Sequence, residues 1–164
     1  MTVDYIGEPY EDPAAMADDS DTVVAGRVTD VASLGRPNTE DDVEADEYVA
    51  VTVDVESVLA GDDVDSVVIG WLAYGTDAEG NRVSEIVQNG VRVPRKGDGM
   101  LLFLVDADPR TARQLGGEPT HAPTRLDGVA FLDESKRVVE LGASSVAGEL
   151  DGRNVDQIRT EFAD

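Results

Sequence analysis

The stretch YVAVTVDVESVL at Tyr48–Leu59 decides the fold class of this chain. Apolar and polar side chains alternate along it. One face carries Val49, Val51, Val53, Val55 and Leu59, and the other carries Tyr48, Thr52, Asp54 and Glu56. A period of two places successive side chains on opposite sides of a strand, which a helix with 3.6 residues per turn does not match. We therefore expect a long strand here, with its valines in the core.

Further strand-like runs lie on both sides of this stretch. Thr22–Ala32 is rich in valine and contains Gly26, and Ser66–Tyr74 follows a turn at Ala60–Asp62, which predicts a hairpin. Met100–Val105 reads MLLFLV and is apolar on both faces, as expected of a central, fully buried strand. Shorter strands are expected at Arg82–Gln88 and Val91–Val93, joined by an Asn89-Gly90 turn, and at Thr124–Leu132 and Arg137–Leu141.

Short helices and loops are expected between and around these strands. Glu11–Asp19 predicts a helix with Pro13 in its first turn, and Asn154–Phe162 predicts a closing helix that Asn154 caps. Three segments are expected to lack regular structure: an extended N-terminal arm at residues 1–10, an acidic loop at residues 34–47 and a loop at Asp106–Pro123.

These elements together predict an all-β fold. The expected architecture is a small OB-like Greek-key barrel of about five to seven strands, with a short N-terminal and a short C-terminal helix. Strands of eleven or twelve residues must coil sharply to stay in one small sheet, and Gly26 and Gly70 lie where such bends would fall. With 164 residues, the chain fits a single domain over residues 1–164.

The charge of the chain is strongly negative and uneven. There are 35 acidic and 13 basic side chains, and of the net charge of −22, residues 1–82 carry −18 and residues 83–164 carry −4. Such a field repels nucleic acid and anionic lipid, so we expect neither as a partner. It suits high salt, where self-repulsion is screened, and is compatible with a halophilic source. The chain contains no cysteine, which excludes disulfides and thiolate metal sites.

Two charged clusters are candidate binding sites. Asp62, Asp63 and Asp65 are candidate ligands for Ca²⁺, which prefers oxygen, although the EF-hand spacing is absent and a polar hairpin tip explains the same residues. No other metal or cofactor is expected. A basic cluster of Arg92, Arg95 and Lys96 is a candidate site for docking an acidic partner or the chain's own acidic loop.

No catalytic residue is predicted. His121 is the only histidine, and its neighbours at residues 118–123 resemble a loop, which favours an exposed or capping histidine over a general base. Ser144 and Ser145 lie in GASSV, which misses the nucleophile-elbow pattern G-x-S-x-G by its last residue and fits a turn better. Trp71 is expected to fill the barrel core.

Four segments carry a family resemblance. They are DDSDTVVAGRV at Asp18–Val28, VDVESVLAG at Val53–Gly61, KGDGMLLFL at Lys96–Leu104 and GVAF at Gly128–Phe131. In this order, the chain resembles bacterial secreted or lipoprotein OB-fold domains of unknown function that are similar to the netrin/TIMP-like barrel. The resemblance spans about residues 11–141 and implies the fold and an extracytoplasmic address, but no reaction. Protease inhibition is not carried over, because the N-terminal cysteine of those inhibitors has no counterpart.

Three functions remain open at this stage. The leading hypothesis is a non-enzymatic, extracytoplasmic binding or interaction domain of unknown ligand. The alternatives are a cytoplasmic accessory or structural subunit of a salt-adapted organism or virus, and a carboxylate- and metal-dependent hydrolase. Met1–Tyr10 has neither a basic region nor an apolar run, so export would require that a leader has been removed. No stretch has the roughly 20 apolar residues of a membrane-spanning helix.

Overall fold

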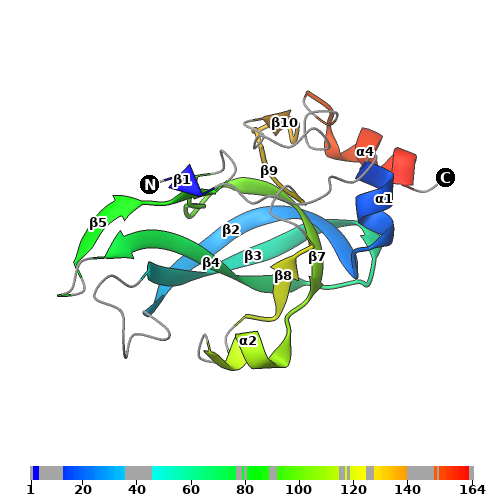
Figure 1. Cartoon of the computed structure of the whole chain (residues 1–164). Coiled ribbons are helices and arrows are strands. Elements are labelled where there is room, and N and C mark those ends of the chain that lie inside the picture. Colours follow the sequence, from blue (N-terminus) through cyan, green and yellow to red (C-terminus); the bar gives the residue numbers. More distant parts are fainter. Residues whose placement is uncertain are drawn as a thin grey trace.

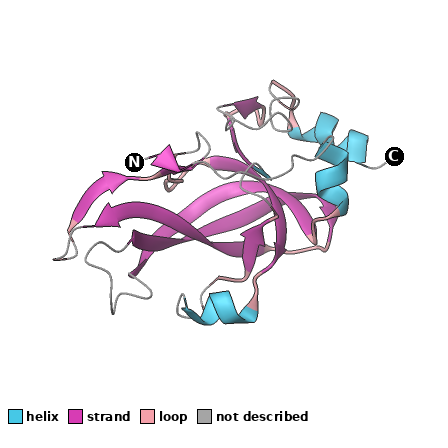
Figure 2. Ribbon diagram, in the orientation of Figure 1, coloured by secondary structure: helices cyan, strands magenta, loops and turns pink. Residues whose placement is uncertain are grey.

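The fold is all-β, with short helices near both ends of the chain (Figures 1 and 2). A computed structural model describes residues 2–3, 13–35, 46–76, 79, 81–88, 92–114, 117, 119–124, 128–139, 150 and 152–162. The strands are β1 (Thr2–Val3), β2 (Thr22–Gly35), β3 (Asp46–Gly61), β4 (Ser66–Thr76), β5 (Arg82–Glu85), β6 (Val87–Gln88), β7 (Gly99–Asp106), β8 (His121–Pro123), β9 (Val129–Leu132) and β10 (Val138–Val139). The helices are α1 (Pro13–Asp18), α2 (Pro109–Gln114) and α4 (Val155–Phe162).

Five strands close into a barrel, which confirms the predicted fold class. β7, β2, β3 and β4 are neighbours in one sheet, and each pair is antiparallel. β8 completes the ring, because it pairs in parallel with β4 and antiparallel with β7. Numbered along the chain, the barrel strands follow the circular order first, second, third, fifth, fourth. This is the Greek-key arrangement of an OB-type barrel.

The long β2–β3 pair curls because its register slips. Between Val23 and Gly26, β3 contributes two residues, Glu56 and Leu59, that have no partner on β2. Each extra residue is a β-bulge, which bends the strand and increases its twist. These bends let strands of 14 and 16 residues wrap around one small core.

Two apolar clusters lie on opposite faces of the barrel wall. The interior cluster includes the buried side chains of Val49, Val51 and Val53 from β3, together with Trp71 and Leu102. The outer cluster lies between β2 and β7 on one side and the terminal segments on the other; it contains Met16, Val23, Ala25, Leu59, Leu101, Phe103, Ala130, Val138, Leu150, Val155 and Ile158. Figure 2 shows α1 and α4 side by side at this end of the molecule.

The expected face of Leu59 was wrong for a physical reason. Simple alternation places it with Val49 and the other inward valines, but it packs in the outer cluster. The bulge at Glu56 reverses the alternation after Val55, so that Val58 faces the interior and Leu59 faces outward.

Several expected elements are confirmed with shifted bounds. The predicted helices correspond to α1 and α4, and the four strongest strands correspond to β2, β3, β4 and β7. Asn154 caps α4 through a reciprocal pair: the Gln157 N–H donates to Asn154 Oδ1, at 2.9 Å, and the Asn154 N–H donates to Gln157 Oε1, at 3.0 Å. The expected strand at Thr124–Leu132 is shorter, since β9 begins at Val129.

Other expectations need correction. The expected loop at Asp106–Pro123 contains α2 and the barrel strand β8. The expected strand Arg82–Gln88 is divided at Ile86 into β5 and β6, and Arg92 and Val93 lie in no strand. The expected arm at residues 1–10 begins with β1, which pairs in parallel with β6. The expected loop at residues 34–47 is shorter, because β2 continues to Gly35 and β3 begins at Asp46. Residues 4–10, 36–45 and 89–91 lie outside the described residues.

Gly26 is the point of closest approach between β2 and β3. A Cβ atom at this position would clash with the backbone oxygen of Asp54 on the neighbouring strand. A side chain here would therefore force the two long strands apart.

We expect Gly26→Ala to destabilise the protein by about 2–3 kcal/mol, because overpacking against backbone shifts the whole pair. The matched control is Gly152→Ala, where φ is +80° and no atom lies within 4 Å of the added Cβ. That control should cost only about 1 kcal/mol for the left-handed conformation. Urea unfolding of the two variants measures the difference. Equal losses would show that the Gly26 contact does not constrain the barrel.

Candidate functional site

Two residues of the basic cluster, Arg95 and Lys96, lie in a hydrogen-bonded turn between β6 and β7. The Asp98 N–H donates to the Arg95 carbonyl at 3.0 Å, and Gly97 has φ of 96°. A positive φ at the third residue is the requirement of a type II turn, which glycine meets without strain. The turn is fixed to β2 by two further bonds of 2.8 Å: the Gly97 N–H donates to the Val28 carbonyl, and the Val28 N–H donates to the Asp98 carbonyl.

Arg92 is held inside this structure rather than presented to a partner. Its two terminal nitrogens donate to the Asp98 carboxylate at 2.9 and 3.1 Å, and its guanidinium lies 4.3 Å from the centre of the Phe131 ring. Burial raises the pKa of Asp98, but hydrogen bonds from Arg92 and from the Arg95 N–H outweigh it and hold the pKa below its usual value. Arg92 is one of the three predicted partner-binding residues, but these contacts show that it stabilises the turn.

Arg95 and Lys96 point away from the turn into solvent. The Arg95 side chain is 67% exposed, and its contact with Glu85 of β5 is long, at 3.9 Å. Lys96 is also exposed. The contact between Arg95 and Glu85 joins the turn to β5, so these two separate segments form one surface.

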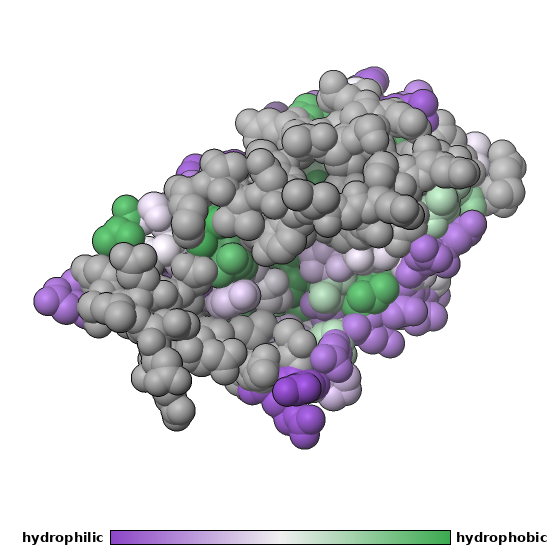
Figure 3. Space-filling view, in the orientation of Figure 1, coloured by the Kyte–Doolittle hydropathy of each residue, from purple (hydrophilic) through white to green (hydrophobic). Residues whose placement is uncertain are grey.

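β5 adds the only exposed large hydrophobic side chain in the described part of the chain. Val83 is 65% exposed, because a register shift between Gly75 and Thr76 of β4 makes it an extra residue in β5. Figure 3 shows apolar surface at the end of the molecule where β5 lies. We call Arg82, Val83, Arg95 and Lys96 the basic edge.

Arg82 fixes β5 to the barrel by reaching across β4. Its Nε lies 3.1 and 3.2 Å from the two carboxylate oxygens of Glu47 on β3, and its guanidinium lies 4.0 Å from the centre of the Tyr74 ring on β4. The hydrogen bond from Arg82 lowers the pKa of Glu47, against the opposing effect of burial. Glu47 is only 8% exposed, and a buried carboxylate is strongly destabilising without its partner.

The acidic calcium candidates lie at the tip of the β3–β4 hairpin. Asp62, Asp63 and Asp65 are exposed, beside a hollow of about 530 Å³ lined by Val55–Val58 and Asp63–Asp65. Within the described residues, no three acidic or histidine side chains are grouped closely enough to hold a metal ion. The backbone N–H of Asp62 donates to the Asp21 carbonyl, at 2.9 Å, and its carbonyl accepts from Thr22, at 2.8 Å. The position of Asp62 is thus explained by the hairpin.

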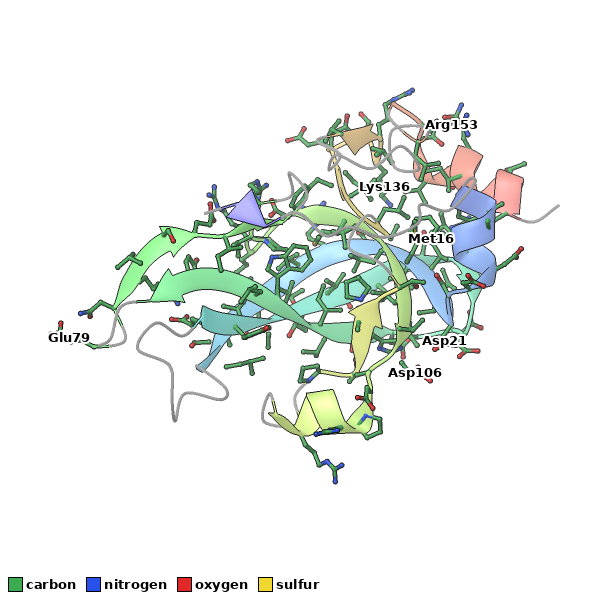
Figure 4. The ribbon with its side chains drawn as sticks, in the orientation of Figure 1. Met16, Asp21, Glu79, Asp106, Lys136 and Arg153 are labelled. Atoms are coloured by element: carbon green, nitrogen blue, oxygen red, sulfur yellow. The ribbon has the colours of Figure 1, made fainter. Side chains whose placement is uncertain are left out.

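His121 lies in the strand that closes the barrel, not in the expected loop. Its Nδ1 is 2.9 Å from Thr120 Oγ1, and its Nε2 is 3.5 Å from an Asp106 carboxylate oxygen. Thr120 in turn bonds to Val68 of β4, and the Asp106 N–H donates to the Asp21 carboxylate at 2.7 Å. Figure 4 shows Asp21 and Asp106 close together. These contacts join β2, β4, β7 and β8 at the place where β8 closes the barrel. Ser144 and Ser145 lie outside the described residues.

The comparisons with known proteins give no family for this chain. No protein-family model matches it, and no curated protein matches it. Among the described residues, no helix is long and apolar enough to cross a membrane.

We expect Glu47→Gln to lower the free energy of unfolding by about 2 kcal/mol at pH 7, because a charged hydrogen bond becomes a neutral one. The pKa of Glu47 is lowered in the folded protein, so the wild-type advantage is complete above its ordinary value of 4.5. It disappears as the pH falls through the folded pKa. Urea unfolding at several pH values measures this, with Glu134→Gln at an exposed turn as the control. A loss that persisted in acid would contradict the electrostatic explanation.

The melting temperature should rise by several degrees between about 0.1 and 1 M KCl, because salt screens the repulsion within a chain of charge −22. CaCl₂ at matched ionic strength should raise it no further, since the described carboxylates do not converge on one position. Calorimetry in the two salts makes the comparison. An excess effect of Ca²⁺ that Asp63→Asn and Asp65→Asn abolish would instead reveal a calcium site.

Proposed function

We propose that this protein is a non-enzymatic binding domain that docks a protein partner through the basic edge. The OB-type barrel supports a binding role, since barrels of this arrangement often recognise ligands on their outer surface. Fold alone is a weak guide to function, so the proposal depends on the side chains of the site. We propose an extracytoplasmic location and kinship with the netrin/TIMP-like barrels on the sequence resemblance.

The packing of the barrel directs binding to its exterior. Apolar side chains from all the long strands fill the interior, including Val51, Ile69 and Leu102, which have no exposed surface. The outer faces of β2 and β7 are covered by side chains of α1 and α4. A partner must therefore contact the remaining surface, to which the basic edge belongs.

The observation that carries the proposal is the fixed presentation of two cations beside an exposed valine. Asp98 and Arg92 neutralise each other behind the turn, and leave Arg95 and Lys96 at its surface. The turn is held by backbone bonds, so less conformational entropy is lost when a partner binds than for a mobile loop. In a protein of charge −22, this local surface favours an acidic partner at contact distance.

The proposal is tested with a blocked peptide of alternating glutamate and valine as the probe. We expect the double variant Arg95→Glu, Lys96→Glu to weaken binding by at least about tenfold in calorimetric titration. The matched control, Arg110→Glu with Arg113→Glu, makes the same change in charge on exposed residues of α2. Equal losses in both variants, or no binding by the wild type, would overturn docking at the basic edge.

The salt dependence of this binding should also be distinctive. The whole protein repels an acidic peptide at long range, whereas the cations of the basic edge attract it at contact. Raising the ionic strength from about 0.01 to 0.1 M shortens the screening length from about 30 to 10 Å, which removes mainly the repulsion. The affinity should therefore hold or rise over this interval. A steep fall would show that attraction at long range controls the association.

A further inference from the structure

The two strands of the β3–β4 hairpin separate near its tip, and a hollow lies between them. The pairing of β3 with β4 ends at Asp54 opposite Ser66, whereas β3 remains paired with β2 as far as Gly61. The segment that returns from Gly61 to β4 therefore stands apart from β3. The hollow that this leaves has a volume of about 530 Å³ and is lined by Val55–Val58 and Asp63–Asp65. Sites for small molecules have volumes in this range.

Backbone hydrogen bonds hold the walls of the hollow in place. The Val55 N–H donates to the Asp65 carbonyl at 2.9 Å, at the point where the two strands part. Near the tip, the Asp62 N–H donates to the Asp21 carbonyl at 2.9 Å, and the Thr22 hydroxyl donates to the Asp62 carbonyl at 2.8 Å. Because the hollow is formed before a ligand arrives, binding loses little conformational entropy in the protein.

Part of the lining is apolar and continuous with the barrel interior. Val55, Val58 and Val64 line the hollow, are half-buried and pack against the interior cluster. Apolar surface in a concavity gains free energy when hydrocarbon groups of a ligand remove it from water. A row of surface carboxylates alone would not define a site. The apolar lining therefore distinguishes this hollow from the rest of the acidic surface.

Three carboxylates in the same lining are available to a cation. Glu56, Asp63 and Asp65 are exposed, and among the described residues their side chains have no hydrogen-bond or ion-pair partner. In that part of the chain, no three such side chains are grouped closely enough to hold a metal ion. A compact ion can therefore not contact all three, whereas an elongated cation with separated charges can.

We propose that the hollow binds a short linear polyamine, an aliphatic chain that carries two or more ammonium groups. Its methylene groups cover the three valines, and its ammonium groups contact the three carboxylates. The charge of −18 on residues 1–82 raises the concentration of cations around this surface. The site is separate from the basic edge, because β5 pairs with the opposite end of β4. It does not depend on the proposed function.

Calorimetric titration with two cations of equal charge tests the proposal, at about 0.15 M KCl to screen general attraction. Spermidine is a linear triamine, and hexaamminecobalt(III) is compact and has no hydrocarbon. We expect one spermidine to bind per chain, at least about tenfold more tightly than hexaamminecobalt(III). Backbone amide shifts on spermidine binding should be largest at Val55–Val58 and Asp63–Asp65.

Matched double variants locate the site. Asp63→Asn with Asp65→Asn should weaken spermidine binding by at least about tenfold. Asp30→Asn with Glu134→Gln is the control, since it removes the same charge from exposed residues of β2 and of the turn between β9 and β10.

Three results would overturn the site. Equal weakening in the two double variants, or equal affinity for the two cations, would show that general attraction to an acidic surface accounts for the binding. Failure of the wild-type protein to bind spermidine would be equally decisive. None of these results bears on the basic edge, which is tested with an acidic peptide.

Discussion

The antiparallel contact between β2 and β3 is the constraint on which the other features depend. It runs from Thr22 opposite Gly61 to Gly35 opposite Tyr48, and at Gly26 the two backbones are too close for any side chain. Both parts of the basic edge are attached to this pair. Val28 of β2 holds the turn with Arg95 and Lys96, and Glu47 of β3 holds Arg82 of β5. The position of the candidate site is thus a consequence of how these strands coil.

The sequence predicted those elements whose signal is local. The alternating valines of β3, the apolar run of β7 and the cap at Asn154 each depend on a few neighbouring residues, and each is found in the structure. The sequence predicted a closed barrel only as a fold class, and it did not indicate which strand closes the ring. β8 has three residues and no periodicity of its own, and its role is set by contacts with β4 and β7.

In the candidate site too, the sequence predicted features with a local signal but not those set by contacts between distant residues. The basic cluster was visible as three cations in five residues, but its sequence could not show that Arg92 is neutralised by Asp98 or that β5 lies beside it. The sequence places Glu47 in an acidic loop, because its partner Arg82 is 35 residues away. Acidic residues were too numerous for any single one to stand out. Only the register of β3, β4 and β5 selects the one that is buried and paired.

The parallel seam between β4 and β8 has a consequence for synthesis of the protein. The Thr120 and Val68 groups that join it are 52 residues apart, so the ring cannot close until the chain beyond β8 has left the ribosome. Until then, β4 and β7 expose open edges to other nascent chains. Pairing of distant strands is also slow. The strong like charge of the first 82 residues would keep those incomplete sheets apart from one another during this interval.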